Sequence, residues 1–192
     1  MARAKPGCMA VVVGPSGAGK DTLIARAAAH LGDRDGIVFV RRIITRDAAA
    51  GGEDHDGVGD AEFEALAASG RFAVSWGAHG LRYGIPVETR QAVETGRLVI
   101  ANGSRSALPD FTTAYPRLVV FNVTARPEVL AQRLATRGRE TEDEIRQRLA
   151  RISLEVTGDY HVVTIDNSDS LEVSAQAFIA ALHELYCGTH FA

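Results

Sequence analysis

Residues 14–21 have the G-x-x-x-x-G-K spacing of a loop that binds phosphate groups. Its members are Gly14, Pro15, Ser16, Gly17, Ala18, Gly19, Lys20 and Asp21. Glycines let main-chain N–H groups converge on phosphate oxygens, and a helix that starts at the loop adds positive potential. A lysine there reaches the outer phosphates as a compact charge, which the rigid fork of an arginine does not duplicate. The spacing therefore predicts a phosphate-binding site in this segment.

The residue after the lysine departs from the usual pattern. Loops of this kind have Ser or Thr there to ligate Mg²⁺, whereas this chain has Asp21. A carboxylate beside a triphosphate is repulsive unless a cation lies between them. We therefore expect Asp21 to bind Mg²⁺, directly or through water. The alternative is that Asp21 caps the helix while Thr22 supplies the hydroxyl group.

Two elements must position this loop. Residues 9–13 are a short, mostly β-branched run that ends at glycine, which predicts a buried strand before the loop. Residues 20–31 place apolar side chains at helical spacing and are followed by Gly32, which predicts a helix after it. The motif therefore lies between the strand and the helix that it requires.

Strands and helices alternate through most of the remaining sequence, which predicts an α/β fold with a parallel sheet and helices on both faces. Buried strands are expected at 98–101, 118–123 and 162–165, and helices between Pro86 and Gly96, at 127–137, from Thr141 onward and at 171–185. Residues 36–88 are richer in strands and loops and look like a lobe inserted in a core of residues 1–35 and 89–192. This lobe is expected to hold a strand at 37–44, a loop at 45–60, a helix at 61–69 capped by Asp60, and strands at 72–76 and 81–85.

Composition argues against several functional classes. The 192 residues include 21 Lys and Arg against 24 Asp and Glu, and this net charge of −3 argues against a general nucleic-acid binder. Cys8 and Cys187 form no CxxC pair, so we expect free thiols in a reducing cytoplasm. The histidines lack metal-binding spacing, and no apolar run approaches the ~20 residues of a membrane span. The only lysines in the sequence are Lys5 and Lys20, and Lys20 lies at the position of the loop motif where phosphate transfer requires a lysine.

Several motifs resemble the guanylate kinase superfamily in order and spacing, over nearly the whole chain. They are the loop, Arg42-Ile-Ile-Thr45-Arg46, Gly51-Gly-Glu53-Asp54, Phe72–Trp76, Tyr83–Pro86 and Arg133–Gly138. The resemblance implies a single domain with a phosphate-loop core, an acceptor-binding lobe at about 36–88 and a lid at about 134–148. Four segments, namely Gly19-Lys-Asp21, Gly51–His55, His79–Pro86 and Val99–Arg105, are similar to one branch. This branch is the ribose 1,5-bisphosphate phosphokinases of phosphonate catabolism, which make 5-phosphoribosyl 1-diphosphate from ATP. That branch implies ATP and Mg²⁺ as cofactors.

The residues that read guanine in guanylate kinases are missing from this sequence. Those enzymes carry Glu before the tryptophan of a Phe-Leu-Glu-Trp segment, where this chain has Ser75, and Ser or Thr after Tyr-Gly, where it has Ile85. Their acid on the strand at 99–101 is replaced by apolar residues. The phosphate-binding residues Arg46 and Tyr83 persist. We therefore expect an acceptor that carries phosphate but no purine.

The resemblance also assigns roles to arginines. We expect Arg42, Arg46, Arg82 and Tyr83 to bind acceptor phosphates, with solvated surface cations as the alternative for each arginine. Arg133 and Arg137 share one helix face and are expected to close over the transferring phosphoryl group as an arginine finger. Arg148 is expected to point inward as well.

Smaller signals leave alternatives open. Residues 53–56 are expected to be a solvated acidic loop, although they can also hold ribose hydroxyls or a second metal. Residues 166–168 either contact adenine or form a plain strand-to-helix turn.

Two other functions compete with the sugar-phosphate kinase, namely a nucleoside monophosphate kinase and a non-catalytic binding module. The expected partners are small molecules, namely ATP and a sugar phosphate, with no nucleic acid or membrane and with a homodimer left open.

Overall fold

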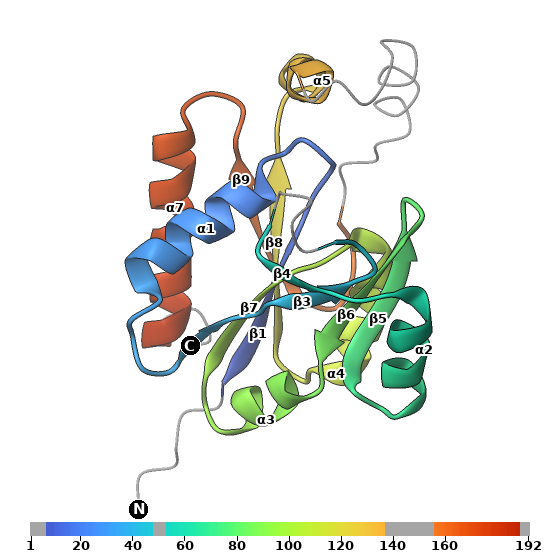
Figure 1. Cartoon of the computed structure of the whole chain (residues 1–192). Helices are drawn as coiled ribbons and strands as arrows, with labels where there is room; N and C mark the ends of the chain where they lie inside the picture. The colour runs from blue at the N-terminus through green and yellow to red at the C-terminus, as the bar shows by residue number, and fades with distance from the viewer. Residues whose placement is uncertain (1–6, 48–52, 137–155, 189–192) are drawn as a thin grey trace, which may run out of the picture.

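A computed structural model describes residues 7–47, 53–136 and 156–188 of the chain (Figure 1). Its centre is a five-stranded sheet in the order β2-β7-β1-β8-β9, in which every neighbouring pair is parallel. The strands are β1 (Cys8–Val13), β2 (Ile37–Phe39), β7 (Leu98–Asn102), β8 (Leu118–Thr124) and β9 (His161–Asp166). The prediction of a parallel α/β sheet is therefore confirmed.

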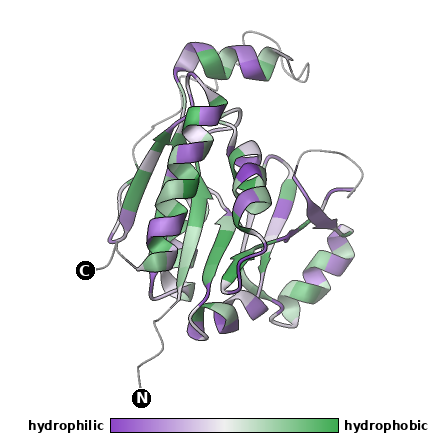
Figure 2. Cartoon of the chain, turned by 90° about the vertical axis from the view of Figure 1, so that its left-hand side faces the viewer, coloured by the Kyte–Doolittle hydropathy of each residue, from purple (hydrophilic) through white to green (hydrophobic). Residues whose placement is uncertain are grey.

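Helices cover both faces of this sheet because β1 is apolar on both sides. Ala10 and Val12 pack in one core cluster with α1 (Lys20–Leu31) and α7 (Leu171–Cys187). The alternate residues Val11 and Val13 pack in a second cluster with α3 (Glu88–Glu94) and α4 (Leu108–Ala114). Figure 2 shows the strands of the core sheet as largely hydrophobic, whereas the helices alternate between hydrophilic and hydrophobic residues.

A second, four-stranded sheet in the order β4-β3-β6-β5 lies beside the first. Its elements are β3 (Arg42–Ile44), β4 (His55–Gly57), β5 (Phe72–Ala78) and β6 (Leu81–Pro86), with α2 (Asp60–Ala68) between β4 and β5. One face joins the second core cluster through Val74 and Ile85. On α2, Phe63 packs against Phe72 with ring centroids 4.6 Å apart.

The second sheet differs from the prediction at three places. The strand expected at 37–44 is two strands, because β2 pairs with β7 of the core sheet and β3 pairs with β6, so the second sheet starts at Arg42 rather than near residue 36. The expected loop at 45–60 contains β4, which pairs in parallel with β3. Asp60 is the first residue of α2 and makes no side-chain cap, since Gly59 holds the cap position.

In the hairpin of β5 and β6, strand β5 ends at Ala78, two residues beyond the end that the sequence predicts at Trp76. Its turn consists of His79 and Gly80, both with positive φ (54° and 72°). A two-residue turn of this kind matches the right-handed twist of paired strands. The helix α4 is an element that the sequence reasoning did not predict.

Candidate active site

The phosphate-binding loop connects β1 to α1, as the motif requires. Gly14 and Gly19 have positive φ values of 149° and 92°, and a Cβ at either would collide with the Val123 carbonyl or the Asn167 side chain. Lys20 folds back over the loop, and its Nζ donates to the carbonyls of Gly14 (3.0 Å) and Pro15 (3.1 Å). The loop is therefore closed around the lysine.

Burial lowers the pKa of Lys20 from 10.5 to about 8. The carboxylate of Asp21 opposes this shift, the positive charges of Arg42 and Arg105 add to it, and Glu53 opposes it more weakly. Charges from the loop helix, from β3 and from the turn after β7 therefore act on one ammonium group. An arriving phosphate is the counter-charge that favours its protonated form.

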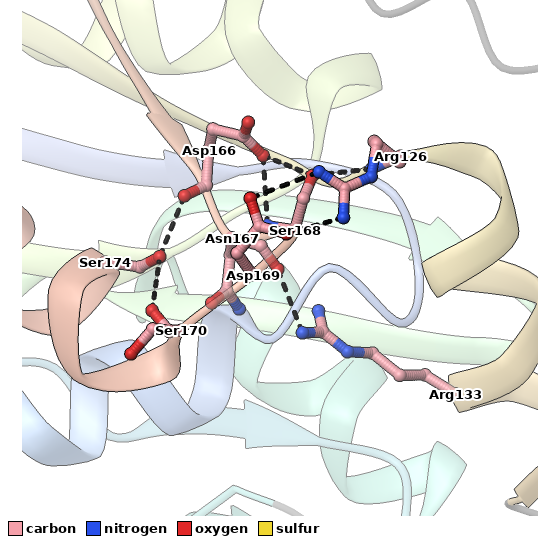
Figure 3. A network of polar contacts seen from close by, with 8 residues as sticks. All are labelled: Arg126, Arg133, Asp166, Asn167, Ser168, Asp169, Ser170 and Ser174. Carbon is pink, nitrogen blue, oxygen red and sulfur yellow. Dashed lines mark hydrogen bonds and ion pairs between the residues drawn. The ribbon is translucent and has the colours of Figure 1, made fainter.

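Arg133 on α5 (Pro127–Thr136) lies against the side of the loop that faces the end of β9 (Figure 3). Its Nη1 donates to the carbonyls of Gly17 (3.4 Å) and Ala18 (3.5 Å), and its Nη2 donates to the carbonyl of Asn167 (2.9 Å). The amide of Asn167 also donates to the Ala18 carbonyl at 2.8 Å. Arg133 and Asn167 together line a cleft of about 460 Å³ beside Gly17 and Gly19.

The turn that carries Asn167 is held by a network of polar contacts (Figure 3). Asp166 accepts hydrogen bonds from the main-chain N–H (3.0 Å) and the hydroxyl (2.5 Å) of Ser168, and the Ser168 hydroxyl oxygen accepts from the Arg126 main-chain N–H at 2.8 Å. Ser174 of α7 donates to the Asp166 carbonyl at 2.8 Å. Residues 166–168 are thus an ordered turn that places the Asn167 amide against the loop.

A buried ion pair occupies the second sheet on its side toward the loop. Arg42 donates through Nε to Glu53 Oε2 at 3.0 Å and through Nη2 to Oε1. The side chains are only 9% and 14% exposed. The Arg42 guanidinium lies over the rings of Tyr83 (4.8 Å to the centroid) and Trp76 (5.7 Å), which stack on each other at 5.4 Å. The prediction that Glu53 belongs to a solvated acidic loop is therefore wrong, although Asp54 and Asp56 are exposed and pair with Arg41.

Asn102, the last residue of β7, joins the loop to this ion pair. Its Nδ2 donates to Asp21 Oδ1 at 2.5 Å and to Glu53 Oε2 at 3.4 Å. The side chain comes close to the loop because Asn102 pairs in register with Val12, two residues before Gly14. One amide group thus connects a carboxylate in the first turn of α1 with one beside the second sheet.

Arg46 and His55 form a second buried contact next to Glu53. Arg46 Nη2 lies 3.4 Å from His55 Nδ1, which is also 2.9 Å from the Glu53 carbonyl. His55 is 2% exposed. Burial raises the pKa of Tyr83, while the charges of Arg42 and Arg46 lower it, so its hydroxyl keeps its proton at neutral pH and can donate it to a phosphate oxygen.

Arg82 is separated from the other predicted acceptor residues. It pairs with Glu64 of α2 and lies over the Phe63 ring at 4.6 Å, on the opposite face of β6 from Tyr83. Adjacent residues of a strand point to opposite faces, so Arg82 and Tyr83 cannot serve one pocket. This corrects the expectation that both face the acceptor. Arg137 and Arg148, and most of the expected lid, lie outside the described residues.

Sequence reasoning missed the partners rather than the positions. The sequence places Glu53 in an acidic run and in a family motif without indicating its partner, and nothing in the pattern marks His55 as buried. The contact of Glu53 with Arg42 spans 11 residues and has no periodicity that would reveal it. The one available signal was the Gly-Gly-Glu motif. Among the described residues, no group of three or more His, Cys, Asp and Glu could hold a metal ion. No described helix has the length and apolarity to span a membrane.

Comparisons with known proteins agree with this geometry. The guanylate kinase family model matches residues 7–184. The chain is similar to ribose 1,5-bisphosphate phosphokinase PhnN of Agrobacterium fabrum, with 56% identity over 92% of this chain and 96% of that protein. The protein of the same name from Rhizobium etli is also 56% identical, over 98% of this chain and 96% of that protein. The structure is similar in fold to guanylate kinase from Anaplasma phagocytophilum (TM-score 0.68, 18% identity, 96% of this chain and 89% of that chain).

Proposed function

Because this chain belongs to the guanylate kinase family, in the branch of the ribose 1,5-bisphosphate phosphokinases, we propose that it phosphorylates ribose 1,5-bisphosphate with ATP. The γ-phosphoryl group leaves ATP as the bond to the β-phosphate oxygen breaks, and a bond forms to an oxygen of the acceptor's 1-phosphate. The products are ADP and 5-phosphoribosyl 1-diphosphate. The observation that carries the proposal is 56% identity to two enzymes of that name over nearly the whole chain.

The acceptor's 1-phosphate oxygen is already anionic, so the reaction needs no strong general base. Phosphoryl transfer then depends on positioning and on neutralising charge. We assign the ATP phosphates to residues 14–22 with Lys20, and the nucleotide cleft to Arg133 and Asn167. The roles of Arg137 and Arg148, and the presence of a lid, are proposed from the family resemblance alone.

We assign the acceptor phosphates to Arg42, Arg46 and Tyr83. The three side chains lie on the side of the second sheet that faces the loop, and the charges of both arginines act on Tyr83. The position of Arg42 over Tyr83 and Trp76 also covers the aromatic surface on which a flat base would stack. A base-free sugar phosphate fits this arrangement better than a nucleoside monophosphate does.

We propose Asp21 as the ligand of Mg²⁺. Its side chain is exposed at the first turn of α1, next to Lys20, and carboxylate oxygen is the donor that Mg²⁺ prefers. The two oxygens of Glu53 are already used by Arg42 and Asn102, so Glu53 is not assigned to the metal. When bound, Mg²⁺ neutralises charge on the outer phosphates of the nucleotide.

The test is turnover with defined acceptors. Purified protein with ATP and Mg²⁺ is given ribose 1,5-bisphosphate, GMP or AMP, and the release of ADP is followed. We expect turnover with the bisphosphate to exceed that with either nucleotide. Faster turnover with GMP would replace the proposal by a nucleoside monophosphate kinase, and no turnover with any acceptor would support a binding module.

A further inference from the structure

We propose that Glu53 is a positioning residue that aims Arg42 at the acceptor phosphate, and that Asn102 ties this pair to Asp21 on the nucleotide side. The inference rests on the proposed function and deepens it. It arises because Glu53 is a carboxylate only 14% exposed to which the reaction described above assigns no ligand.

The orientation of Arg42 is fixed in two directions. One face of its guanidinium lies on the Tyr83 ring, and its Nε–Nη2 edge is held by the two oxygens of Glu53. A planar guanidinium held by one face and one edge is restrained from rotating, and the donors left for a ligand are those of its Nη1–Nη2 edge. Binding of a phosphate at that edge then requires no reordering of the side chain.

Glu53 itself has little left to offer a ligand. Its Oε1 accepts from Arg42 Nη2, and its Oε2 accepts from both Arg42 Nε (3.0 Å) and Asn102 Nδ2 (3.4 Å). A carboxylate that reads ribose hydroxyls would keep an oxygen directed away from its own chain. The contacts therefore favour a role through Arg42 over direct binding of the sugar.

The burial of this pair is a second argument. Removing two charges from water costs free energy that their attraction does not always repay, and an apolar pair of similar size is often as stable. Arg42 and Glu53 are nevertheless the ion pair with the least exposed side chains among those recorded for the described residues. Its placement between the phosphate-binding loop and the aromatic pair of Trp76 and Tyr83 is consistent with a role in the reaction.

Asn102 connects this arrangement to the nucleotide side. Its amide nitrogen carries two hydrogens, and its recorded acceptors are Asp21 Oδ1 and Glu53 Oε2. The same amide therefore relieves the repulsion between two carboxylates and sets the distance between the residue proposed for Mg²⁺ and the residue that aims Arg42. The acceptor site and the nucleotide site are thereby fixed relative to each other.

The test is steady-state kinetics of Glu53→Gln with ribose 1,5-bisphosphate and ATP. We expect the KM for the acceptor to rise about tenfold, the scale of one charge-assisted hydrogen bond, with the KM for ATP unchanged. The matched control is Asp54→Asn, which removes a neighbouring carboxylate that pairs with exposed Arg41. It should change neither KM. Equal KM values for Glu53→Gln and the parent protein would overturn the proposal.

A double-mutant cycle separates positioning from a purely structural effect. Arg42→Gln removes the ligand edge but keeps a donor for Glu53, and we expect Glu53→Gln to add nothing to the acceptor KM in that background. Additive effects would show that Glu53 acts independently of Arg42. Circular dichroism shows whether Glu53→Gln folds. If it does not, Asn102→Ala replaces it as the test variant and should also raise the KM for the acceptor. An unchanged KM for the acceptor in Asn102→Ala would contradict the proposal. Failure of the proposed function itself would look different, because the parent protein would then not turn over the bisphosphate.

Discussion

Lys20 is the side chain that we propose to hold the outer phosphates of the nucleotide. It is enclosed by the loop carbonyls, its pKa is about 8, and four charged side chains act on it. A lysine with that pKa is mostly protonated at pH 7 and mostly neutral at pH 9. The charge that we propose to hold the nucleotide phosphates is therefore lost within a pH range that an assay can reach.

We predict that kcat/KM for ATP falls above about pH 8, by up to about tenfold per pH unit, because this ratio reports the free enzyme. A lysine with a depressed folded pKa binds fewer protons than in the unfolded chain between about pH 8 and 10.5, so this group raises stability as pH rises there. The loss of activity is thus not unfolding caused by Lys20. The measurement is a pH profile at saturating acceptor, and a flat profile to pH 10 would contradict it.

The ammonium group itself should be indispensable. We predict that Lys20→Arg keeps the fold but reduces kcat by at least about 100-fold, because the planar guanidinium cannot take the place of Nζ between the Gly14 and Pro15 carbonyls. Thermal unfolding followed by circular dichroism serves as the control for folding. Near-normal turnover would show that any cation suffices at this position.

Asp21 gives a separate prediction about the metal. Asp21→Ala should raise the Mg²⁺ concentration needed for half-maximal activity, because one carboxylate ligand is lost. Asp21→Asn keeps an acceptor oxygen near Asn102 without the charge. The Mg²⁺ concentration that it needs should lie between those of the parent protein and of Asp21→Ala. A magnesium titration at fixed ATP measures this, and an unchanged requirement in Asp21→Ala would support Thr22 as the source of the ligand; Asp21 does not cap α1, because Gly19 holds the cap position and no side chain caps it.

At the scale of elements, the packing of the Phe72 ring of β5 between β6 and Phe63 of α2 depends on a residue with no side chain. Gly84 lies against the Phe72 ring, and a Cβ there would collide with it. In the same hairpin, Gly77 also lacks a side chain but has only an ordinary contact at 3.9 Å to the Leu81 carbonyl. The two glycines of one hairpin therefore differ in the space around them.

We predict that Gly84→Ala destabilises the protein by about 1–3 kcal/mol, because Phe72 and then Phe63 must shift in a packed layer. Gly77→Ala, the matched control, should stay within about 0.5 kcal/mol of the parent. Urea unfolding measures both. Equal midpoints for the two variants would mean that the Phe72 ring moves aside at little cost.

The sequence predicted most of the core elements because their patterns are local. Residues 9–13, 98–101 and 118–123 are apolar runs, and β1, β7 and β8 lie where these runs are. The split between β2 and β3 was not predicted, although Arg41 and Arg42 interrupt the apolar residues of 37–44, because the pairing of one strand with β7 and of the other with β6 is not a local pattern. The short strand β4 is a three-residue stretch held by its pairing with β3. In the site, the loop followed from its spacing, whereas the contacts of Asn102 and Glu53 depend on how two sheets meet.

For the molecule as a whole, the distribution of charge matters more than the net value of −3. Several recorded ion pairs, such as Arg71–Glu88 and Arg126–Asp169, are more than half exposed on both sides, and pairs of that kind contribute little to stability. The charges around Lys20, by contrast, come from α1, from β3, from the turn after β7 and from Glu53 before β4, and they surround the proposed phosphate site.

We therefore predict that salt separates stability from substrate binding. Raising KCl from 0.05 to about 0.5 M should change Tm by less than about 2 °C, because exposed pairs are already weak, while the KM values for both phosphate substrates rise several-fold through screening. Differential scanning fluorimetry and kinetics at constant free Mg²⁺ measure the two. A large fall in Tm with unchanged KM values would show that the charges stabilise the fold rather than bind the phosphate substrates.

The lowered pKa of Lys20 has a further consequence, for covalent labelling. Near neutral pH this lysine holds a larger fraction of unprotonated amine than an ordinary lysine does, and the unprotonated amine attacks aldehydes. The sequence contains only one other lysine, Lys5. An aldehyde that carries a phosphate group would enter the loop as a ligand and form a Schiff base with Lys20. A spectroscopic reporter can therefore be attached inside the nucleotide site of the natural sequence, and bound nucleotide should protect that site from the reagent.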